Sequence, residues 1–238
     1  MIEVVAETGS TSADLSARIA SGEVVEDGHW LVADRQSAGR GRQGRIWSDG
    51  AGNFMGSTAV NLRAGDPPAH TLSLVTGVAT FAAIEAVAPG IGDLRLKWPN
   101  DLLVGEAKLA GILLERRRDT VVIGVGVNLA TEPPVSERSV ASLAEQGFIV
   151  PRDAFSTALE RCWADALQRW RGSDWNGLRQ DWIVRAHPVG TPLTVHGPDS
   201  VPVRGTFAGL DEEGALQLLL SNGTRRIIHA GEVFLDRR

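Results

Sequence analysis

The segment that most constrains the fold is Thr71–Ala88, because it is predicted to form a helix without a polar face. Its sequence, TLSLVTGVATFAAIEAVA, carries apolar or small residues all round the helix and ends at Pro89-Gly90. Such a helix is stable in water only when other elements bury every side of it. Short β runs follow at Leu94–Trp98, Leu102–Val104, Leu109–Glu115 and Val121–Leu129, with a tight turn at Gly105-Glu106. We therefore predict an α+β fold in which a sheet and further helices bury this segment.

The N-terminal region adds one helix and two strands to this pattern. A short helix is predicted after Thr11, with Thr11 and Asp14 in a capping arrangement and Gly22 marking its end. Strands are predicted at His29–Ala33 and Phe54–Leu62.

The C-terminal half changes from helical to β patterning. Helical stretches follow a break at Pro133-Pro134, and their tryptophans recur at i+7, as is typical of a buried helix face, in the pairs Trp163/Trp170 and Trp175/Trp182. From about Gly190 onward, short β runs alternate with Gly-, Asp- and Asn-containing turns. We therefore predict a larger domain over residues 1–187 and a small all-β domain over residues 188–238.

Composition narrows the class of protein. The chain has 238 residues, of which 43% are hydrophobic and 22% charged, as is ordinary for a soluble protein with a core. Its net charge of −5 disfavours a nucleic-acid-binding surface, no apolar run approaches the ~18 residues of a membrane span, and the N-terminus lacks a signal-peptide pattern. Cys162, the single cysteine, is predicted to be a packed apolar residue, and it leaves no internal disulfide, which favours the cytoplasm. Five scattered histidines predict no protein-ligated metal.

The most specific motif is the loop Gly39–Arg45, GRGRQGR, with Gln36 before it and Trp47 after it. Glycines allow a backbone to approach a ligand closely, and arginines are forked donors for carboxylate and phosphate oxygens. The alternative is a Gly/Arg-rich RNA-binding tail, but such tails are long and repeated. The Gly-Lys-Ser/Thr ending of a Walker loop is absent. The motif therefore predicts a loop that binds a small anion.

The second motif contains both lysines of a chain that has 24 basic residues, Lys97 and Lys108. Pro99 is predicted to form a turn that aims Asn100 and Asp101 out of the sheet, and the following hairpin could return Lys108 beside them. The alternatives are a surface hairpin with an ion pair, and arginine-favouring codon usage that left two lysines by chance.

The motifs GSTS, Q-x-x-GRGR-x-GR-x-W, KWPNDL, KLAGIL and GVGVN, in this order, resemble those of biotin–protein ligases (biotin–[acetyl-CoA-carboxylase] ligases). The resemblance covers most of residues 7–130. It implies a class II synthetase-like domain with a mixed β-sheet flanked by helices, and a small C-terminal SH3-like β-barrel. It also implies that biotin and MgATP give biotinyl-5′-AMP, from which biotin passes to a lysine of a biotin carboxyl carrier protein domain.

The resemblance assigns site residues position by position. Those implied to bind biotin are Ser10, Thr11, Ser12, Gln36, Arg40, Gly41, Arg42 and Lys108. Those implied to bind ATP or the adenylate are Arg40, Arg42, Arg45, Trp47, Asn100, Lys108 and Asn128. The implied catalytic residues are Lys108, Arg40 and Asp101, and we hypothesise that Asp101 orients or deprotonates the acceptor amine. Mg²⁺ is expected to arrive with ATP. The chain departs from the family at Ser12, where Asn is common, and at Gln43, where Arg is frequent.

Other functions stay open at this point. A lipoate– or octanoate–protein ligase has a related fold, and a non-catalytic biotin or adenylate sensor would share the pocket. No DNA partner is expected, because the catalytic motifs begin by residue 8 and leave no room for an N-terminal winged-helix domain. No membrane partner is expected, and the protein is expected to be a monomer or a homodimer.

Overall fold

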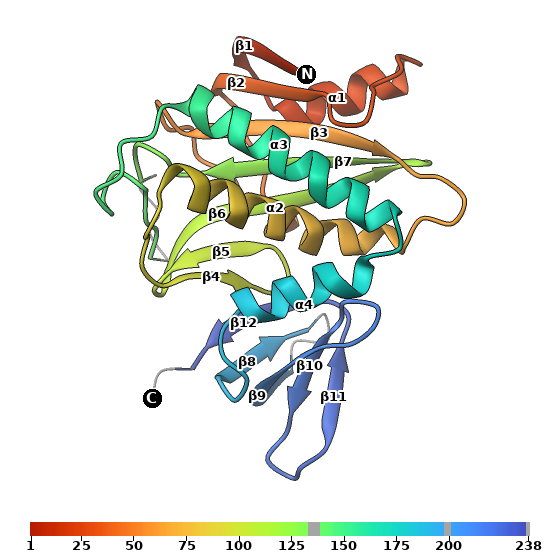
Figure 1. Ribbon diagram of the computed structural model, residues 1–238, viewed down its shortest axis with the longest axis vertical. Coiled ribbons are helices and arrows are strands. Elements are labelled where there is room, and N and C mark those ends of the chain that lie inside the picture. Colours follow the sequence, from red (N-terminus) through yellow and green to blue (C-terminus); the bar gives the residue numbers. More distant parts are fainter. Residues whose placement is uncertain (133–138, 198–200, 237–238) are drawn as a thin grey trace.

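The computed structural model describes residues 1–132, 139–197 and 201–236, which form two sheets and four α-helices (Figure 1). The first sheet has the order β1-β2-β3-β7-β6-β5-β4, and the second has the order β11-β10-β9-β8-β12. The strands of the first sheet are β1 (Ile2–Thr8), β2 (Trp30–Gln36), β3 (Phe54–Asn61), β4 (Leu94–Lys97), β5 (Asp101–Val104), β6 (Ala107–Arg117) and β7 (Thr120–Val127). Those of the second are β8 (Pro192–His196), β9 (Pro202–Leu210), β10 (Leu216–Leu219), β11 (Arg225–Ile228) and β12 (Glu232–Leu235). The helices are α1 (Thr11–Ala20), α2 (Leu72–Val87), α3 (Arg152–Arg171) and α4 (Trp175–Arg185), with 3₁₀ turns η1 (Arg42–Gly44) and η2 (Ala69–Thr71).

The first sheet is mixed, since β1 runs parallel to β2 and the remaining neighbours are antiparallel. Alternate residues of its strands face opposite sides. Trp30 and Val32 of β2 join the large core with α2 and α3, whereas Leu31 packs with Leu15 of α1 in a smaller cluster. The sheet is therefore covered on both faces, and the prediction of a mixed sheet flanked by helices is confirmed.

Helix α2 occupies the centre of the large core, as the sequence predicts. It packs against α3 and α4 on one side and the sheet on the other (Figure 1). One expectation was wrong: the segment 69–87 is long and apolar enough to cross a membrane by length and composition alone. About two thirds of it (67%) is buried inside this fold, and a buried core helix meets the same criterion.

The predicted tryptophan faces lie where the helices meet the core. Trp163 and Trp170 have no exposed surface, and Trp163 packs edge-to-face on Trp30 with ring centroids 6.3 Å apart. Trp182 is 2% exposed and contacts Phe207 of β9 at 6.5 Å, so it joins the second sheet to the core. Trp175 is half-buried.

Three details differ from the predictions or fall outside them. Strand β1 was missed, because it is an edge strand with only partly buried side chains. Ser10, and not Thr11, is the N-cap of α1, and Asp14 instead accepts a hydrogen bond from the Thr8 hydroxyl. The break at Pro133-Pro134 lies outside the described residues.

Other outcomes concern the C-terminal part. A small antiparallel β unit is present there, as predicted, and the boundary between residues 187 and 188 stays a prediction. Burial raises the pKa of the half-buried Cys162 thiol, which favours the packed, unreactive form expected of it.

Candidate active site

A cavity of about 470 Å³ lies where the start of α1, the 39–48 loop, the turn between β4 and β5, strands β6 and β7, and β12 converge. All the residues that the family resemblance assigns to biotin, ATP or catalysis line it. They are Ser10, Thr11, Ser12, Gln36, Arg40, Gly41, Arg42, Arg45, Trp47, Asn100, Asp101, Lys108 and Asn128. The cavity therefore brings together motifs that are more than 100 residues apart.

Neutral side chains gather at one end of the cavity, where α1 begins against β2 and β3. Gln36 Oε1 accepts the Thr11 backbone N–H at 2.8 Å and the Thr11 hydroxyl at 3.1 Å. The Ser57 hydroxyl lies 2.7 Å from Thr11 Oγ1 and 2.9 Å from Ser12 Oγ. These three residues, Gln36 and the helix cap Ser10 are all buried. Because none of them is charged, this end suits an uncharged group with its own donors and acceptors.

Glycines of β6 and β7 form the floor of the cavity. A Cβ atom at Gly126 would lie 2.3 Å from Cε2 of Trp47, and one at Gly111 would lie 3.0 Å from the same indole. A Cβ atom at Gly124 would lie 2.6 Å from Ser12 Oγ. Glycines within a strand often mark the close approach of another group. Here the approaching groups are side chains of this chain, and they require glycine at these positions.

The Gly/Arg-rich loop is folded back on itself. Gly39 O accepts the Trp47 N–H at 3.0 Å, and Arg45 O accepts the Gly41 N–H at 2.7 Å. A Cβ atom at Gly39 would lie 2.5 Å from Trp47 O, so the loop can close only with glycine there. Gln43 has a φ of 57°, in the left-handed region. This compact, hydrogen-bonded loop is unlike an extended RNA-binding tail.

Cationic side chains occupy the end of the cavity opposite the neutral cluster. Arg42 Nη1 donates to Asn100 Oδ1 at 3.0 Å, and Lys108 Nζ donates to Asp101 Oδ1 at 2.6 Å. Burial lowers the pKa of Arg42, opposed by the nearby Asp101 carboxylate. Arg40 is exposed at the loop. The predicted return of Lys108 beside the turn is confirmed, and the site gathers cations around the Asp101 carboxylate.

The second sheet contributes one wall of the cavity. Arg45 Nη1 forms an ion pair with Glu232 Oε1 at 2.9 Å, and Val233 lies beside Glu232 in the lining. The exposed Arg45 of the loop is therefore held by a residue 187 positions away in the chain.

Asn128 lies at the end of β7 and is almost fully buried. Its backbone N–H donates to Leu109 O at 2.9 Å and its side-chain amide to Ala141 O at 3.0 Å. In the structure it therefore holds the 139–141 segment against β6 while lining the cavity.

Comparison with known proteins identifies the family. Residues 8–128 match the Biotin/lipoate A/B protein ligase family, and residues 195–236 match the Biotin protein ligase C terminal domain. The chain belongs to the biotin/lipoate A/B protein ligase family. It is 36% identical to the biotin–[acetyl-CoA-carboxylase] ligase of Mycobacterium tuberculosis, over 98% of this chain and 88% of that one. It is 35% identical to the ligase of the same name from Paracoccus denitrificans, over 97% and 99%.

A solved structure of a biotin protein ligase superposes on the whole of this chain. The biotin protein ligase from Aquifex aeolicus in complex with biotin and ATP superposes with a TM-score of 0.85 at 26% identity. The match covers 100% of this chain and 99% of that one, so it includes both sheets.

Sequence reasoning missed several lining residues of this ligase-family site. Ser57 belongs to no recognised motif, although a buried strand with Gly-Ser-Thr at its centre is a signal that could have identified it. Gly111 was quoted within KLAGIL without a role. Glu232 and Val233 carry no local signal, because their place at the cavity depends on how the second sheet docks.

Proposed function

We propose that this chain is an ATP-dependent biotin–protein ligase. It joins biotin to ATP to give biotinyl-5′-AMP and pyrophosphate, and then transfers biotin to a lysine of a biotin carboxyl carrier protein domain. The observation that carries the proposal is that one cavity combines a neutral hydrogen-bonding end with a cationic end. Biotin has the matching shape, with an uncharged ureido ring at one end and a carboxylate at the other.

The first step joins two anions, so charge neutralisation and orientation dominate its catalysis. The biotin carboxylate oxygen attacks the α-phosphorus of ATP, an O–P bond forms, and the bond to the β-phosphate breaks to release pyrophosphate. Arg40, Arg42 and Lys108 supply the cations around this point, and Asn100 holds Arg42 in place. Arg45, Trp47 and Asn128 complete the adenylate side of the cavity.

In the second step the acceptor lysine nitrogen attacks the acyl carbon, an amide bond forms, and AMP leaves. The amine must lose a proton first, because an ammonium is no nucleophile. Asp101 is the carboxylate beside Lys108 in the cationic end, and its oxygen already accepts a hydrogen bond from the Lys108 ammonium. We assign it the orientation or deprotonation of the acceptor amine.

Mg²⁺ fits this site only together with ATP. Among the described residues, no group of three His, Cys, Asp or Glu side chains is placed to hold a metal ion. Mg²⁺ commonly binds through one or two carboxylates plus substrate phosphates, and Asp101 is a carboxylate of that kind in the cavity. When bound, the ion would neutralise phosphate charge.

The alternative substrate is lipoate or octanoate, since the matched family covers lipoate ligases as well as biotin ligases. The buried neutral cluster favours biotin, because the ureido ring offers donors and acceptors to its hydroxyl and amide groups, whereas a dithiolane ring or an alkyl chain offers none. The deciding test is ATP–pyrophosphate exchange with each acid. Biotin-dependent exchange is expected, and exchange with lipoate alone would refute the assignment.

The acceptor and compartment complete the proposal. Incubation with biotin, MgATP and an acetyl-CoA carboxylase carrier domain should add one biotinyl group to one carrier lysine, measured by mass spectrometry. Tight retention of biotinyl-AMP without transfer to any carrier domain would favour a sensor instead. We place the reaction in the cytoplasm, in line with a single cysteine, and expect a monomer or homodimer.

A further inference from the structure

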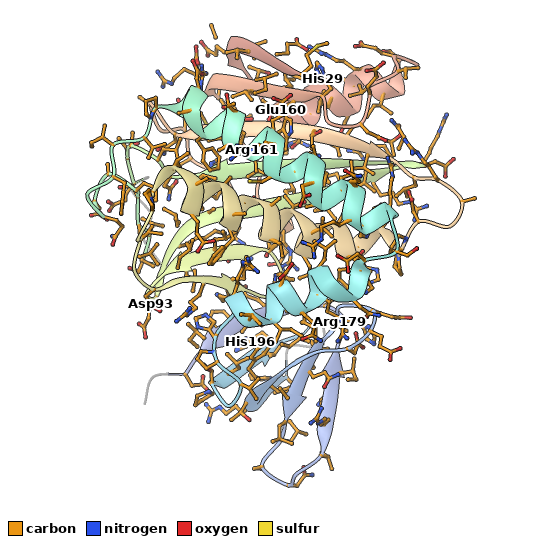
Figure 2. The ribbon with its side chains drawn as sticks, in the orientation of Figure 1. His29, Asp93, Glu160, Arg161, Arg179 and His196 are labelled. Carbon is orange, nitrogen blue, oxygen red and sulfur yellow. The ribbon has the colours of Figure 1, made fainter. Side chains whose placement is uncertain are left out.

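The turn between β9 and β10, residues 211–215, is held by side chains from three separate parts of the first domain. Each donates to, or pairs with, a main-chain carbonyl at or beside this turn. The contacts are Arg179 Nη1 to Leu210 O at 2.9 Å, Trp175 Nε1 to Glu212 O at 2.6 Å, His70 Nε2 to Glu213 O at 2.8 Å, and Trp98 Nε1 to Gly214 O at 3.2 Å. Arg179 lies on α4, the helix that faces the second sheet (Figure 2). Four of the five carbonyls from Leu210 to Gly214 are therefore bonded by side chains of the first domain.

The β9–β10 turn is itself rigid. Asp211 Oδ1 accepts the backbone N–H groups of Glu213 and Ala215, at 3.0 and 2.8 Å. Gly214 has a φ of +84°, and a Cβ atom there would lie 2.8 Å from Cδ1 of Leu74 in α2. Because these internal bonds fix the turn, the Gly214 carbonyl has a defined position, and so does the side chain that donates to it.

Trp98 differs from the other three donors because it lines the cavity itself and leads directly into Asn100 and Asp101 in the chain. It is the first residue of the β4–β5 turn, residues 98–100, which leads into Asp101. Its indole is 6% exposed, and its N–H points to the second sheet. The same turn is held on its other sides by a hydrogen bond from Ser73 Oγ to Pro99 O at 3.0 Å and by one from the Ile112 backbone N–H to Asn100 O at 2.9 Å.

We infer that Trp98 is a positioning residue, through which the second sheet sets the place of Asn100 and Asp101 in the active site. The indole N–H bond to Gly214 O anchors the start of the turn whose end orients Arg42 and Lys108. The inference rests on the proposed ligase function. It assigns the C-terminal β unit a part in the adenylation step beyond covering the cavity.

The test compares Trp98→Phe with Trp175→Phe. Each variant keeps an aromatic ring and removes one indole N–H from the same turn, but only Trp98 is continuous with the site. Trp98→Phe is expected to lower kcat/KM for ATP in biotin-dependent pyrophosphate exchange by about three- to tenfold, the size expected for one net hydrogen bond. Trp175→Phe is expected to stay within about twofold of wild type. The dissociation constant for biotin should be unchanged in Trp175→Phe. In Trp98→Phe it should rise by less than kcat/KM for ATP falls, because Arg42 and Lys108 hold only the carboxylate end of biotin and the neutral cluster is not displaced.

Equal kcat/KM values for the two variants would overturn the inference. So would a loss of kcat/KM that stands in the same proportion to the drop in thermal midpoint in both variants, because the loss would then follow from reduced stability. Gly214→Ala provides a second variant that leaves Trp98 intact and displaces the carbonyl, since a Cβ atom would press on Leu74. It should produce the same defect, and the double variant Trp98→Phe/Gly214→Ala should be no slower than the worse single one. Additive losses would count against the inference. Wild-type protein without biotin-dependent exchange would overturn the proposed function, and the inference with it.

Discussion

Replacing Lys108 separates the charge of this residue from its shape. The ammonium lies 2.6 Å from Asp101 Oδ1, and the two side chains are only 25% and 12% exposed. Lys108→Ala leaves the carboxylate partly buried without its partner, which costs about 1–3 kcal/mol of folding free energy. For a chain of this size, each kcal/mol lowers the melting midpoint by about 2–4 °C. Lys108→Arg keeps the charge and should retain most of that stability.

The two variants should nevertheless both lose adenylation. The Nζ atom lies 3.0 Å from the point where a Gly111 Cβ would stand, with the Trp47 ring centroid 5.7 Å away, so a planar guanidinium cannot occupy the same position. Loss of one positioned charge-stabilising donor typically costs ~10²–10³ in rate. We expect at least about a hundredfold loss of pyrophosphate exchange for Lys108→Ala, and at least about tenfold for Lys108→Arg. Thermal melts run in parallel verify the stability difference. A near-normal exchange rate for Lys108→Ala would remove this residue from the mechanism.

Other predictions address the floor, the transfer step and pH. Gly126→Ala should weaken ATP binding at least about tenfold in calorimetry, because its Cβ would displace the Trp47 indole on the adenylate side of the cavity, whereas Gly92→Ala, with open space around it, should have no effect. Asp101→Asn should slow transfer from preformed biotinyl-AMP, and an unchanged transfer rate would refute its assigned role. The Arg18 hydrogen bonds lower the pKa of the Glu3 carboxyl from 4.5 to about 2, so this pair stabilises the fold above pH ~4.5 and loses that contribution as pH falls towards about 2. Arg18→Gln should therefore lower the free energy of unfolding at pH 7, measured by denaturant titration, by less than ~1 kcal/mol, because Glu3 is one third exposed. The difference from wild type should shrink below pH 4.5.

Local sequence patterns were enough to predict helices with a continuous apolar pattern and elements that end at a Gly or Pro turn. The all-apolar segment became α2 within one residue at each end, and the hairpin turn at Gly105 lies between β5 and β6 with a φ of 58°. Strand β1 was missed because an edge strand has no fully buried face to produce alternation. The cap of α1 was misplaced by one residue, since Ser10, Thr11 and Ser12 are all plausible caps by composition.

The site residues that could be predicted are also those that lie in local sequence motifs. Arg42 and Lys108 were identified because each lies in a short sequence motif of unusual composition. Ser57 was not, because its only signal is the small polar run Gly-Ser-Thr within a buried strand, and its role depends on how α1 packs over it. The docking of the second sheet could not be predicted from local sequence either, because the Trp98 contact with Gly214 joins residues 116 positions apart.

The ion pair between Arg45 and Glu232 has a consequence for synthesis. The chain emerges from the ribosome with its N-terminus first. The Gly/Arg-rich loop, the glycine floor and both lysines can therefore begin to fold well before Glu232 emerges. Until then Arg45 lacks this partner and the cavity lacks one wall. A nascent or prematurely terminated chain would thus present an incomplete pocket, and the enclosure that protects a reactive acyl-phosphate from water would be completed only when translation has passed the last strand.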